Sequence, residues 1–164
     1  RSQGGNNNSW CQNSLLGLMN WDHNQQDLEL LNYLKYVIKI RKKLIKIFNP
    51  SFLPNNQNNE NIPKYHWHGT KLDSPDWSSW SHTVAFSINT GKTNPLVWIG
   101  LNAYSKSIDF TLPKCKYNWL KVIDTSMTEI FEPLTVNEKT VLINSRSSLL
   151  IISEELFGGR KNLF

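Results

Sequence analysis

The sequence predicts a mainly β protein in which a C-terminal antiparallel β-sandwich follows one loop and one long helix. Three observations lead to this fold class. Apolar side chains recur at intervals of three and four over residues 25–48. Residues 49–63 are rich in Asn and Pro and show no periodicity. From Tyr65 onward, short β-rich runs are separated by Gly, Asn, Pro or Ser, with no further helical segment between them.

Residues 25–48 form the predicted helix, QQDLELLNYLKYVIKIRKKLIKIF. Asn24 can cap its first turn, and Asp27 lies near its N-terminus, where the helix dipole favours acidic groups. The predicted buried stripe consists of Leu30, Leu34, Val37, Ile38, Leu44, Ile45 and Phe48. The apolar face is widened by Leu28, Leu31, Tyr33 and Ile40. Such a helix needs a large apolar surface, which no segment before it can supply, so it is predicted to be the last α-unit of a larger α/β domain.

Five runs in the second half of the chain are the predicted strands. They are HTVAFSINT from residue 82, LVWIGLNAY from 96, KSIDFTLP from 106, WLKVIDTS from 119 and TVLINSRSSLLIIS from 140. Trp98 and Trp119 lie within these runs and are expected in the core. The predicted organisation is a loop and helix over residues 1–49, a linker over 50–64 and the sandwich over 65–164.

The composition fits an ordinary folded domain. The 164 residues are 39% hydrophobic and 12% aromatic, with seven Trp and a formal net charge of +5. Six of the eighteen Lys and Arg residues lie between Lys35 and Lys46, and the absence of a recognition motif favours a solvated helix face over nucleic-acid binding. No run approaches the roughly 18 apolar residues of a membrane span. Cys11 and Cys115 have no metal-ligand spacing, which favours a reducing compartment.

Several short motifs follow one another along nearly the whole chain. They are RSQGGNNNSWCQ at 1–12, LMNWD at 18–22, WHG at 67–69, SPDWS at 74–78, HTVAFSIN at 82–89, LNAYSKSIDFTLP at 101–113, WLKVIDTS at 119–126 and RSSLLIIS at 146–153. On these motifs the chain resembles the C-terminal portion of isoamylase-type glycogen or starch debranching enzymes, which are glycoside hydrolases of the α-amylase superfamily. The Asn triplet followed by an aromatic residue and CQ is the most specific motif, and its surroundings look most similar to cyanobacterial members.

The resemblance implies that residues 1–49 are the last loop and last helix of a truncated (β/α)8 barrel. Active sites of such barrels lie at the C-terminal ends of the strands. In this family the nucleophilic aspartate, the acid glutamate and a stabilising aspartate come from earlier strands, upstream of Arg1. No residue of this chain is therefore assigned a catalytic role, and the chain alone is predicted to be inactive.

The resemblance also implies what the intact enzyme does. It would hydrolyse α-1,6 branch linkages by a retaining mechanism, with an α-glucan (glycogen or amylopectin-like) and the N-terminal barrel as partners. No cofactor, metal, nucleic acid or membrane is expected, and the expected location is the cytoplasm, or the plastid stroma of a plant or alga. The missing initiator Met fits a processed terminus, an expression boundary or a fragment. The alternative is a non-catalytic glucan-binding or scaffolding sandwich derived from such an enzyme.

The candidate substrate-binding residues are Asn6, Asn7, Asn8 and Trp10. Asn amides both donate and accept hydrogen bonds, as sugar hydroxyls require, and Trp10 can offer an apolar face to a glucose ring. The same amides can instead hold the loop through bonds to its own backbone. Both alternatives stay open at this stage.

A second candidate group is aromatic. Trp67, Trp77 and Trp80 are expected to cluster before the first sandwich strand, where they either form a glucan platform or attach the sandwich to the barrel. His66 and His68 flank Trp67, but two such side chains are too few to predict a metal site. Asp73 and Asp76 lie in the turn-like sequence LDSPDWSS and are expected to shape that turn.

Overall fold

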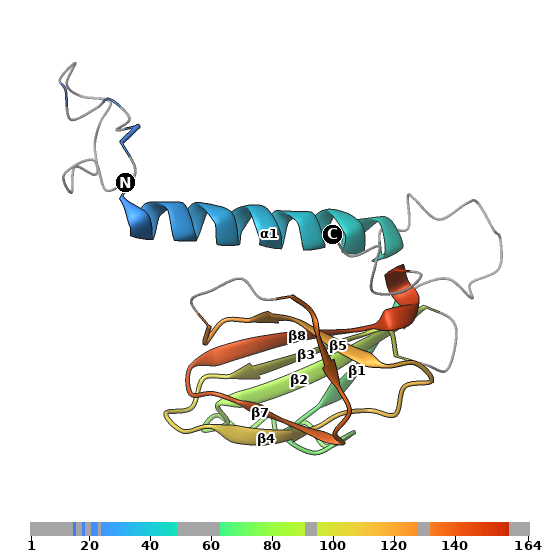
Figure 1. The fold of residues 1–164 in the computed structure, drawn as a ribbon. Helices are drawn as coiled ribbons and strands as arrows, with labels where there is room; N and C mark the ends of the chain where they lie inside the picture. Colours follow the sequence, from blue (N-terminus) through green and yellow to red (C-terminus); the bar gives the residue numbers. More distant parts are fainter. Residues whose placement is uncertain are drawn as a thin grey trace.

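The protein has three layers in the computed structural model, which describes residues 15, 18, 21, 22, 24–48, 63–90, 95–127 and 132–157. A six-stranded antiparallel sheet lies in the middle, helix α1 (Gln25–Phe48) crosses one face, and a two-stranded sheet covers the other (Figure 1). The predicted antiparallel sandwich is thereby confirmed. The assignment of α1 to a barrel stays a prediction.

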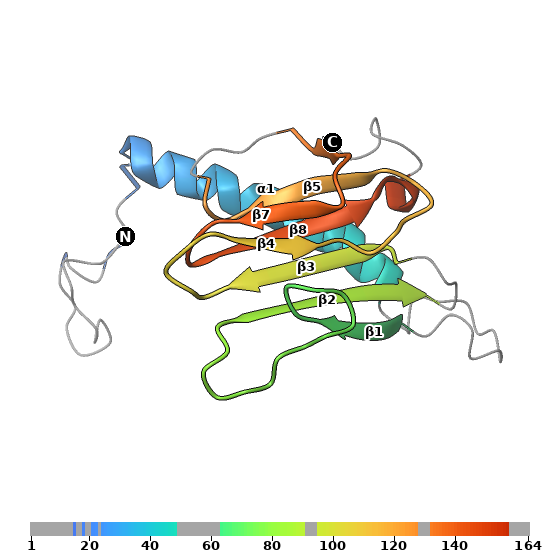
Figure 2. The ribbon, with the colours of Figure 1, turned by 90° about the horizontal axis from the view of Figure 1, so that it is seen from below.

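The larger sheet has the strand order β1-β2-β3-β8-β5-β6. Its strands are β1 (Pro63–His68), β2 (Thr83–Thr90), β3 (Val97–Asn102), β8 (Ser147–Ser153), β5 (Trp119–Asp124) and β6 (Leu134–Val136). The smaller sheet pairs β4 (Ile108–Thr111) with β7 (Thr140–Ile143), and a short 3-10 helix, η6 (Glu154–Phe157), follows β8. Because β8 inserts between β3 and β5, the last strand of the described residues lies inside the sheet (Figure 2).

The strands differ from the prediction in three places. The alternation predicts neither β1 nor β6, and it predicts β7 and β8 as one run. The sequence predicts that Trp67 lies ahead of the first strand. In the structure β1 begins at Pro63, so Trp67 lies inside an edge strand. Arg146 has φ 51°, a left-handed conformation that turns the chain between β7 and β8. With three residues, β6 is too short to show a periodicity.

Helix α1 has the bounds that its sequence predicts. The Asp27 N–H donates to Oδ1 of Asn24 at 2.8 Å, and the Asn24 N–H donates to Oδ2 of Asp27 at 3.3 Å. These reciprocal bonds satisfy donors that the first turn of a helix leaves unpaired. The predicted cap at Asn24 is therefore confirmed. Within the described residues, no helix combines the length and the apolar character needed to cross a bilayer.

The helix contacts the sheet through a side other than the one that carries Leu30, Leu34 and Ile38. Ile40 is 1% exposed and joins a cluster with Ile88, Val97, Leu120, Val122 and Ile152. Tyr36 and Leu44 pack against the same cluster. The Tyr36 hydroxyl donates to the carbonyl oxygen of Val122 at 2.7 Å, and burial raises the pKa of Tyr36 to about 12. The spacing of four between residues 36, 40 and 44 thus forms the docked side of α1.

Four members of the predicted buried stripe form an exposed surface instead. Leu30, Leu34, Ile38 and Ile45 are between 39% and 68% exposed and share one side of α1; they are called the outer helix face below. The resemblance implies that this stripe packs on barrel strands, which the described residues do not include, so that contact stays a prediction. The apolar surface that the described residues offer to α1 belongs to the sandwich, which meets the neighbouring side of the helix.

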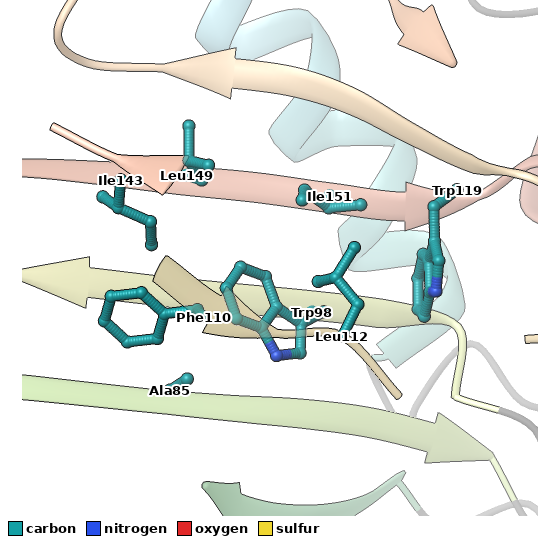
Figure 3. Packing of buried hydrophobic residues seen from close by; sticks show 8 residues of the cluster. All are labelled: Ala85, Trp98, Phe110, Leu112, Trp119, Ile143, Leu149 and Ile151. Carbon is teal, nitrogen blue, oxygen red and sulfur yellow. The ribbon is translucent and has the colours of Figure 1, made fainter. Parts of the chain in front are cut away.

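The core between the two sheets surrounds Trp98. Its members are Ala85, Trp98, Phe110, Leu112, Trp119, Ile143, Leu149 and Ile151 (Figure 3). The rings of Trp98 and Phe110 meet edge to face, with centroids 6.1 Å apart and planes at 74°. The prediction that Trp98 and Trp119 are core residues is confirmed. A Cβ at Gly100 would overlap the Trp98 ring and Ile143, so the close packing here requires glycine.

Candidate functional site

The candidate residues fall into three groups. Asn6, Asn7, Asn8 and Trp10 lie outside the described residues, so their sugar-binding role stays a prediction. The other candidates lie on the sandwich, where successive side chains of edge strand β1 point to opposite faces. Tyr65 and Trp67 pair with Ile88 and Phe86, residues of the α1 side of the sheet. His66 and His68 therefore point to the opposite side.

Four aromatic side chains gather on the α1 side of the sheet edge. Tyr65, Trp67, Trp77 and Phe86 are called the aromatic face below. The Trp67 ring lies 5.2 Å from Phe86 and 5.3 Å from Trp77, and the Tyr65 ring lies 6.4 Å from Phe86. Trp67 and Trp77 meet edge to face at 73°. Trp80 is exposed and joins no ring of this group within the described part of the chain, so the structure unites two of the three predicted tryptophans.

Two aspartates shape the loop that carries Trp77. Oδ1 of Asp76 accepts hydrogen bonds from the Ser78 hydroxyl at 2.7 Å and the Ser78 N–H at 3.0 Å, and these bonds lower the pKa of Asp76. Asp73 has φ 53°, and its N–H donates to Nδ1 of His68 at 3.0 Å. Both aspartates thus stabilise the turn, as the sequence predicts, and the loop holds Trp77 against β1.

The opposite face of the same edge contains a cavity of about 530 Å³. Its floor consists of buried residues from β1, β2 and the segment before β3, namely His68, Ser87, Asn89 and Pro95. Its rim carries exposed charged or polar side chains, namely Lys64, His66, Asp73 and Lys114. This combination of donors and acceptors around a hollow is called the polar cavity below.

His68 is a neutral structural residue of the floor. It is 3% exposed, and its Nε2 lies 3.0 Å from the Ser87 hydroxyl oxygen. Because Nδ1 accepts the Asp73 N–H, the proton belongs on Nε2, which donates to Ser87. Burial lowers the pKa of His68 and outweighs the Asp73 carboxylate, which lies 3.3 Å from Nδ1 but is 83% exposed. This histidine therefore fixes the loop to the sheet.

Asn89 has an unsatisfied polar atom. It is 9% exposed, its Nδ2 lies 3.3 Å from Nε2 of His66, and its Oδ1 has no hydrogen-bond partner among the described residues. If Oδ1 and Nδ2 of Asn89 were exchanged, the atom at the present Oδ1 position would still lack a hydrogen-bond partner. The missing hydrogen bond therefore does not depend on which atom is assigned as oxygen. An unpaired buried polar group costs about 1–3 kcal/mol. A second such atom among the described residues, Nε1 of Trp98, lies in the core between the two sheets, so an unpaired atom does not by itself mark a site.

The polar cavity contains two histidines but no set of metal ligands. Across the described ranges, no group of three or more His, Cys, Asp and Glu side chains could hold a metal ion. The sequence reasoning missed the cavity itself. A signal for the cavity exists in β2, where polar and apolar residues alternate. The polar residues Ser87 and Asn89 share a side of the strand with Ala85, whereas Phe86 and Ile88 lie on the side of α1.

The region that carries both surfaces matches a known protein family. Residues 66–154, more than half of the chain, match the family described as Isoamylase 1-3, C-terminal. The chain belongs to this family. The matched part extends from within β1 to the start of η6, so it includes most of the polar cavity and most of the aromatic face. The resemblance inferred from the sequence motifs is confirmed.

Three plant proteins are similar over a longer stretch. The chain is 29% identical over 135 residues to "Isoamylase 1, chloroplastic" of Oryza sativa subsp. japonica. It is 26% identical to "Isoamylase SU1, chloroplastic" of Zea mays and 24% identical to "Isoamylase 1, chloroplastic" of Arabidopsis thaliana, each over 136 residues. Each alignment covers 82% of this chain and 16% of the relative. In a chain of 164 residues, an aligned stretch of 135 residues begins at residue 30 or earlier and ends at residue 135 or later. The likeness therefore includes most of α1.

Proposed function

We propose that this chain is the C-terminal segment of a debranching enzyme that hydrolyses α-1,6-glucosidic branch linkages of glycogen or amylopectin-like glucan. The match of residues 66–154 to the isoamylase C-terminal family is the observation that carries the proposal. Hydrolysis with retention requires two carboxylates about 5–5.5 Å apart, one as nucleophile and one as acid and base. We assign both to the barrel, upstream of Arg1.

Three carboxylates of the sandwich support this assignment because they have structural partners. Asp124 accepts hydrogen bonds from the Ser126 hydroxyl at 2.6 Å and from Nζ of Lys121 at 2.9 Å. Burial alone would raise the pKa of Asp124, but these hydrogen bonds hold it below its ordinary value. Asp73 and Asp76 shape the loop that carries Trp77. None of these carboxylates is proposed to act on a glycosidic bond.

We propose further that α1 joins the sandwich to the barrel. Its docked side contacts the sheet through Tyr36, Ile40 and Leu44, and its outer helix face is left for the barrel. Large exposed apolar surfaces mark contacts with other proteins or domains. The aromatic face lies on the same side of the sheet. The 73° angle between Trp67 and Trp77 favours a packed contact there, because the two rings do not form one flat platform for a sugar chain.

The cellular compartment that we propose depends on the organism that produces the protein. The printed names of the plant relatives contain the word chloroplastic, which supports the plastid stroma for a plant or algal source. The cytoplasm is proposed for a bacterial source. Fractionation of the source cells, with detection by an antibody against the sandwich, tests the two alternatives.

The test of the function compares residues 1–164 with the longer reading frame that the proposal requires. The longer product is expected to release reducing ends from amylopectin, and residues 1–164 alone are expected to release none. In the longer product, Leu34→Asp should lower the rate severalfold because it places a charge in the contact with the barrel. Leu142→Asp is the matched control, since Leu142 is an exposed leucine on β7.

Three results would redirect the proposal. Debranching by residues 1–164 alone would refute the upstream position of the carboxylates. An unchanged rate in Leu34→Asp would refute the contact between α1 and the barrel. Glucan binding by residues 1–164, together with an inactive longer product, would instead support the non-catalytic glucan-binding or scaffolding alternative.

A further inference from the structure

We propose that a hollow beside Trp77 binds one glucosyl unit of an α-glucan, on the side of the larger sheet that carries α1. The hollow, called the Trp77 hollow below, has a volume of about 400 Å³. This volume lies within the range of about 300–1,000 Å³ that is typical of small-molecule sites. The inference rests on the proposed function for the identity of the sugar alone, because the hollow and its side chains belong to the sandwich itself.

The floor of the Trp77 hollow is apolar. Val84 of β2 pairs with Leu101 of β3, and both residues line the hollow. They lie two positions from Phe86 and Ile99, which pack against the cluster that contains Ile40 of α1, so they share that side of the sheet. No described residue of α1 lines the hollow. The hollow therefore lies on a part of this side that α1 leaves uncovered.

Hydrogen bonds within the protein hold the residues around this floor. The Ser78 hydroxyl and N–H both donate to Oδ1 of Asp76, and the Ser81 N–H donates to the Ser78 carbonyl oxygen at 3.0 Å. The Ala103 N–H donates to the carbonyl oxygen of His82 at 2.8 Å. All five residues line the hollow. The hollow is therefore formed before a ligand binds, which limits the entropy lost on binding.

Two aromatic side chains line the hollow. Trp77 contacts Trp67 edge to face but is 66% exposed, so much of its ring is open to a ligand. His82 stacks on Tyr104, with ring centroids 5.9 Å apart and planes at 26°, and this contact orients the His82 ring. One face of a glucosyl ring presents C–H groups, which pack on an aromatic ring as other apolar groups do. A single unit needs only one open ring, so the 73° angle between Trp67 and Trp77 does not oppose it.

The Trp77 hollow differs from the surfaces assigned to the barrel. Of the aromatic face, Trp77 alone lines the hollow, and no described residue of the outer helix face does. Sugar binding and the barrel contact therefore use different residues, with the exception of Trp77.

The charges around the hollow favour a neutral ligand. Among the described residues that line it, none is Lys or Arg, and Asp76 carries the one carboxylate. A phosphate would therefore meet a negative charge without a compensating cation. Asp76 is exposed and its Oδ1 already accepts two hydrogen bonds from Ser78, so water and these bonds weaken its attraction for a cation. Sugar hydroxyls both donate and accept, so they can pair with the Asp76 carboxylate and the Ser81 hydroxyl.

Calorimetry with maltotriose and the 164-residue chain tests the site. We expect saturable binding to the parent chain, at least tenfold weaker binding to Trp77→Ala and severalfold weaker binding to His82→Ala. Both residues are exposed, so both variants are expected to fold, which the melting temperature checks. His82→Ala carries the test if Trp77→Ala does not fold.

Trp80→Ala is the matched control. Trp80 is 77% exposed and lies in the same loop as Trp77, between β1 and β2, but it does not line the hollow. This variant should bind maltotriose as the parent does. Inorganic phosphate and choline, an anion and a cation, should give no saturable heat with the parent chain.

Several outcomes would overturn the inference. No maltotriose binding at millimolar concentration refutes it, and so do equal losses of binding in Trp77→Ala and Trp80→Ala. Loss of binding in Trp67→Ala but not in His82→Ala would assign the sugar to the aromatic face. Saturable binding of phosphate or choline that maltotriose does not displace would make the hollow an ion site. Debranching by the longer product without maltotriose binding by the 164-residue chain refutes this site alone, whereas binding without debranching refutes the proposed function alone.

Discussion

Replacing Ile40 with Ala tests whether α1 is docked on the sheet as the structure shows. Ile40 is 1% exposed and is the α1 member of a cluster that otherwise comes from the sheet. The replacement removes three carbon atoms, which are worth about 2.4 kcal/mol at about 0.8 kcal/mol each. The cavity that remains adds to this loss, as in other buried truncations that cost about 2–5 kcal/mol. We therefore expect a loss of about 2.5–4 kcal/mol in the free energy that holds α1 on the sheet.

The matched control lies on the same helix. Leu30→Ala truncates a side chain of the outer helix face that is 68% exposed, so we expect a loss below about 0.5 kcal/mol. Both substitutions introduce alanine, the residue with the best helix propensity, so neither weakens the helix through its backbone. The difference between the two variants therefore reports the docking of α1 on the sheet.

Two measurements separate docking from global stability. Urea unfolding followed by tryptophan fluorescence reports the sandwich, because Trp98 and Trp119 lie in its core. Amide hydrogen exchange in α1 reports opening of the helix layer alone. The docking reasoning is refuted if Ile40→Ala and Leu30→Ala agree within about 0.5 kcal/mol in both measurements, or if Leu30→Ala causes the larger loss.

Two further predictions concern the sandwich. Gly100→Ala should destabilise it by about 1–3 kcal/mol or more, because the new methyl group overlaps the Trp98 ring and Ile143; urea unfolding that matches the parent within error would contradict this packing. Burial lowers the pKa of His68 below 6.5, the ordinary value that the unfolded chain has. As the pH falls, the unfolded chain therefore binds a proton at this histidine before the folded chain does. The free energy of unfolding should consequently fall as the pH drops below about 6.5. His68→Gln should remove this part of the pH dependence and the exposed-histidine control His82→Gln should keep it, so an identical pH profile for parent and His68→Gln counts against the reasoning.

Local patterns predicted the elements that local interactions determine. The bounds of α1 follow from its apolar spacing and from the reciprocal bonds of Asn24 and Asp27, which span three residues. The turn roles of Asp73 and Asp76 follow from similarly short contacts. The core positions of Trp98 and Trp119 follow from the alternation of long strands. Strands β1 and β6 lie at the sheet edges, where fewer side chains are buried and the alternation is correspondingly weak.

Long-range contacts determined what the sequence left open at the candidate site. Asn89 and His66 are 23 residues apart, and only the pairing of β1 with β2 brings them together. The loop after β1 then completes the cavity, and no spacing in the sequence records its volume. Trp67 and Trp77 meet for a similar reason, because the intervening turn folds back on the strand.

The sequence by itself determined the helix bounds, the antiparallel sandwich and, through its motifs, membership in the isoamylase family. Only the tertiary structure decided which side of α1 is buried. Periodicity shows that Leu30, Leu34 and Ile38 share one side of the helix and that Tyr36, Ile40 and Leu44 share another, but both sides are apolar. The choice between them depends on which neighbouring layer the chain provides. In this chain that layer is the sandwich, which contacts residues 36, 40 and 44.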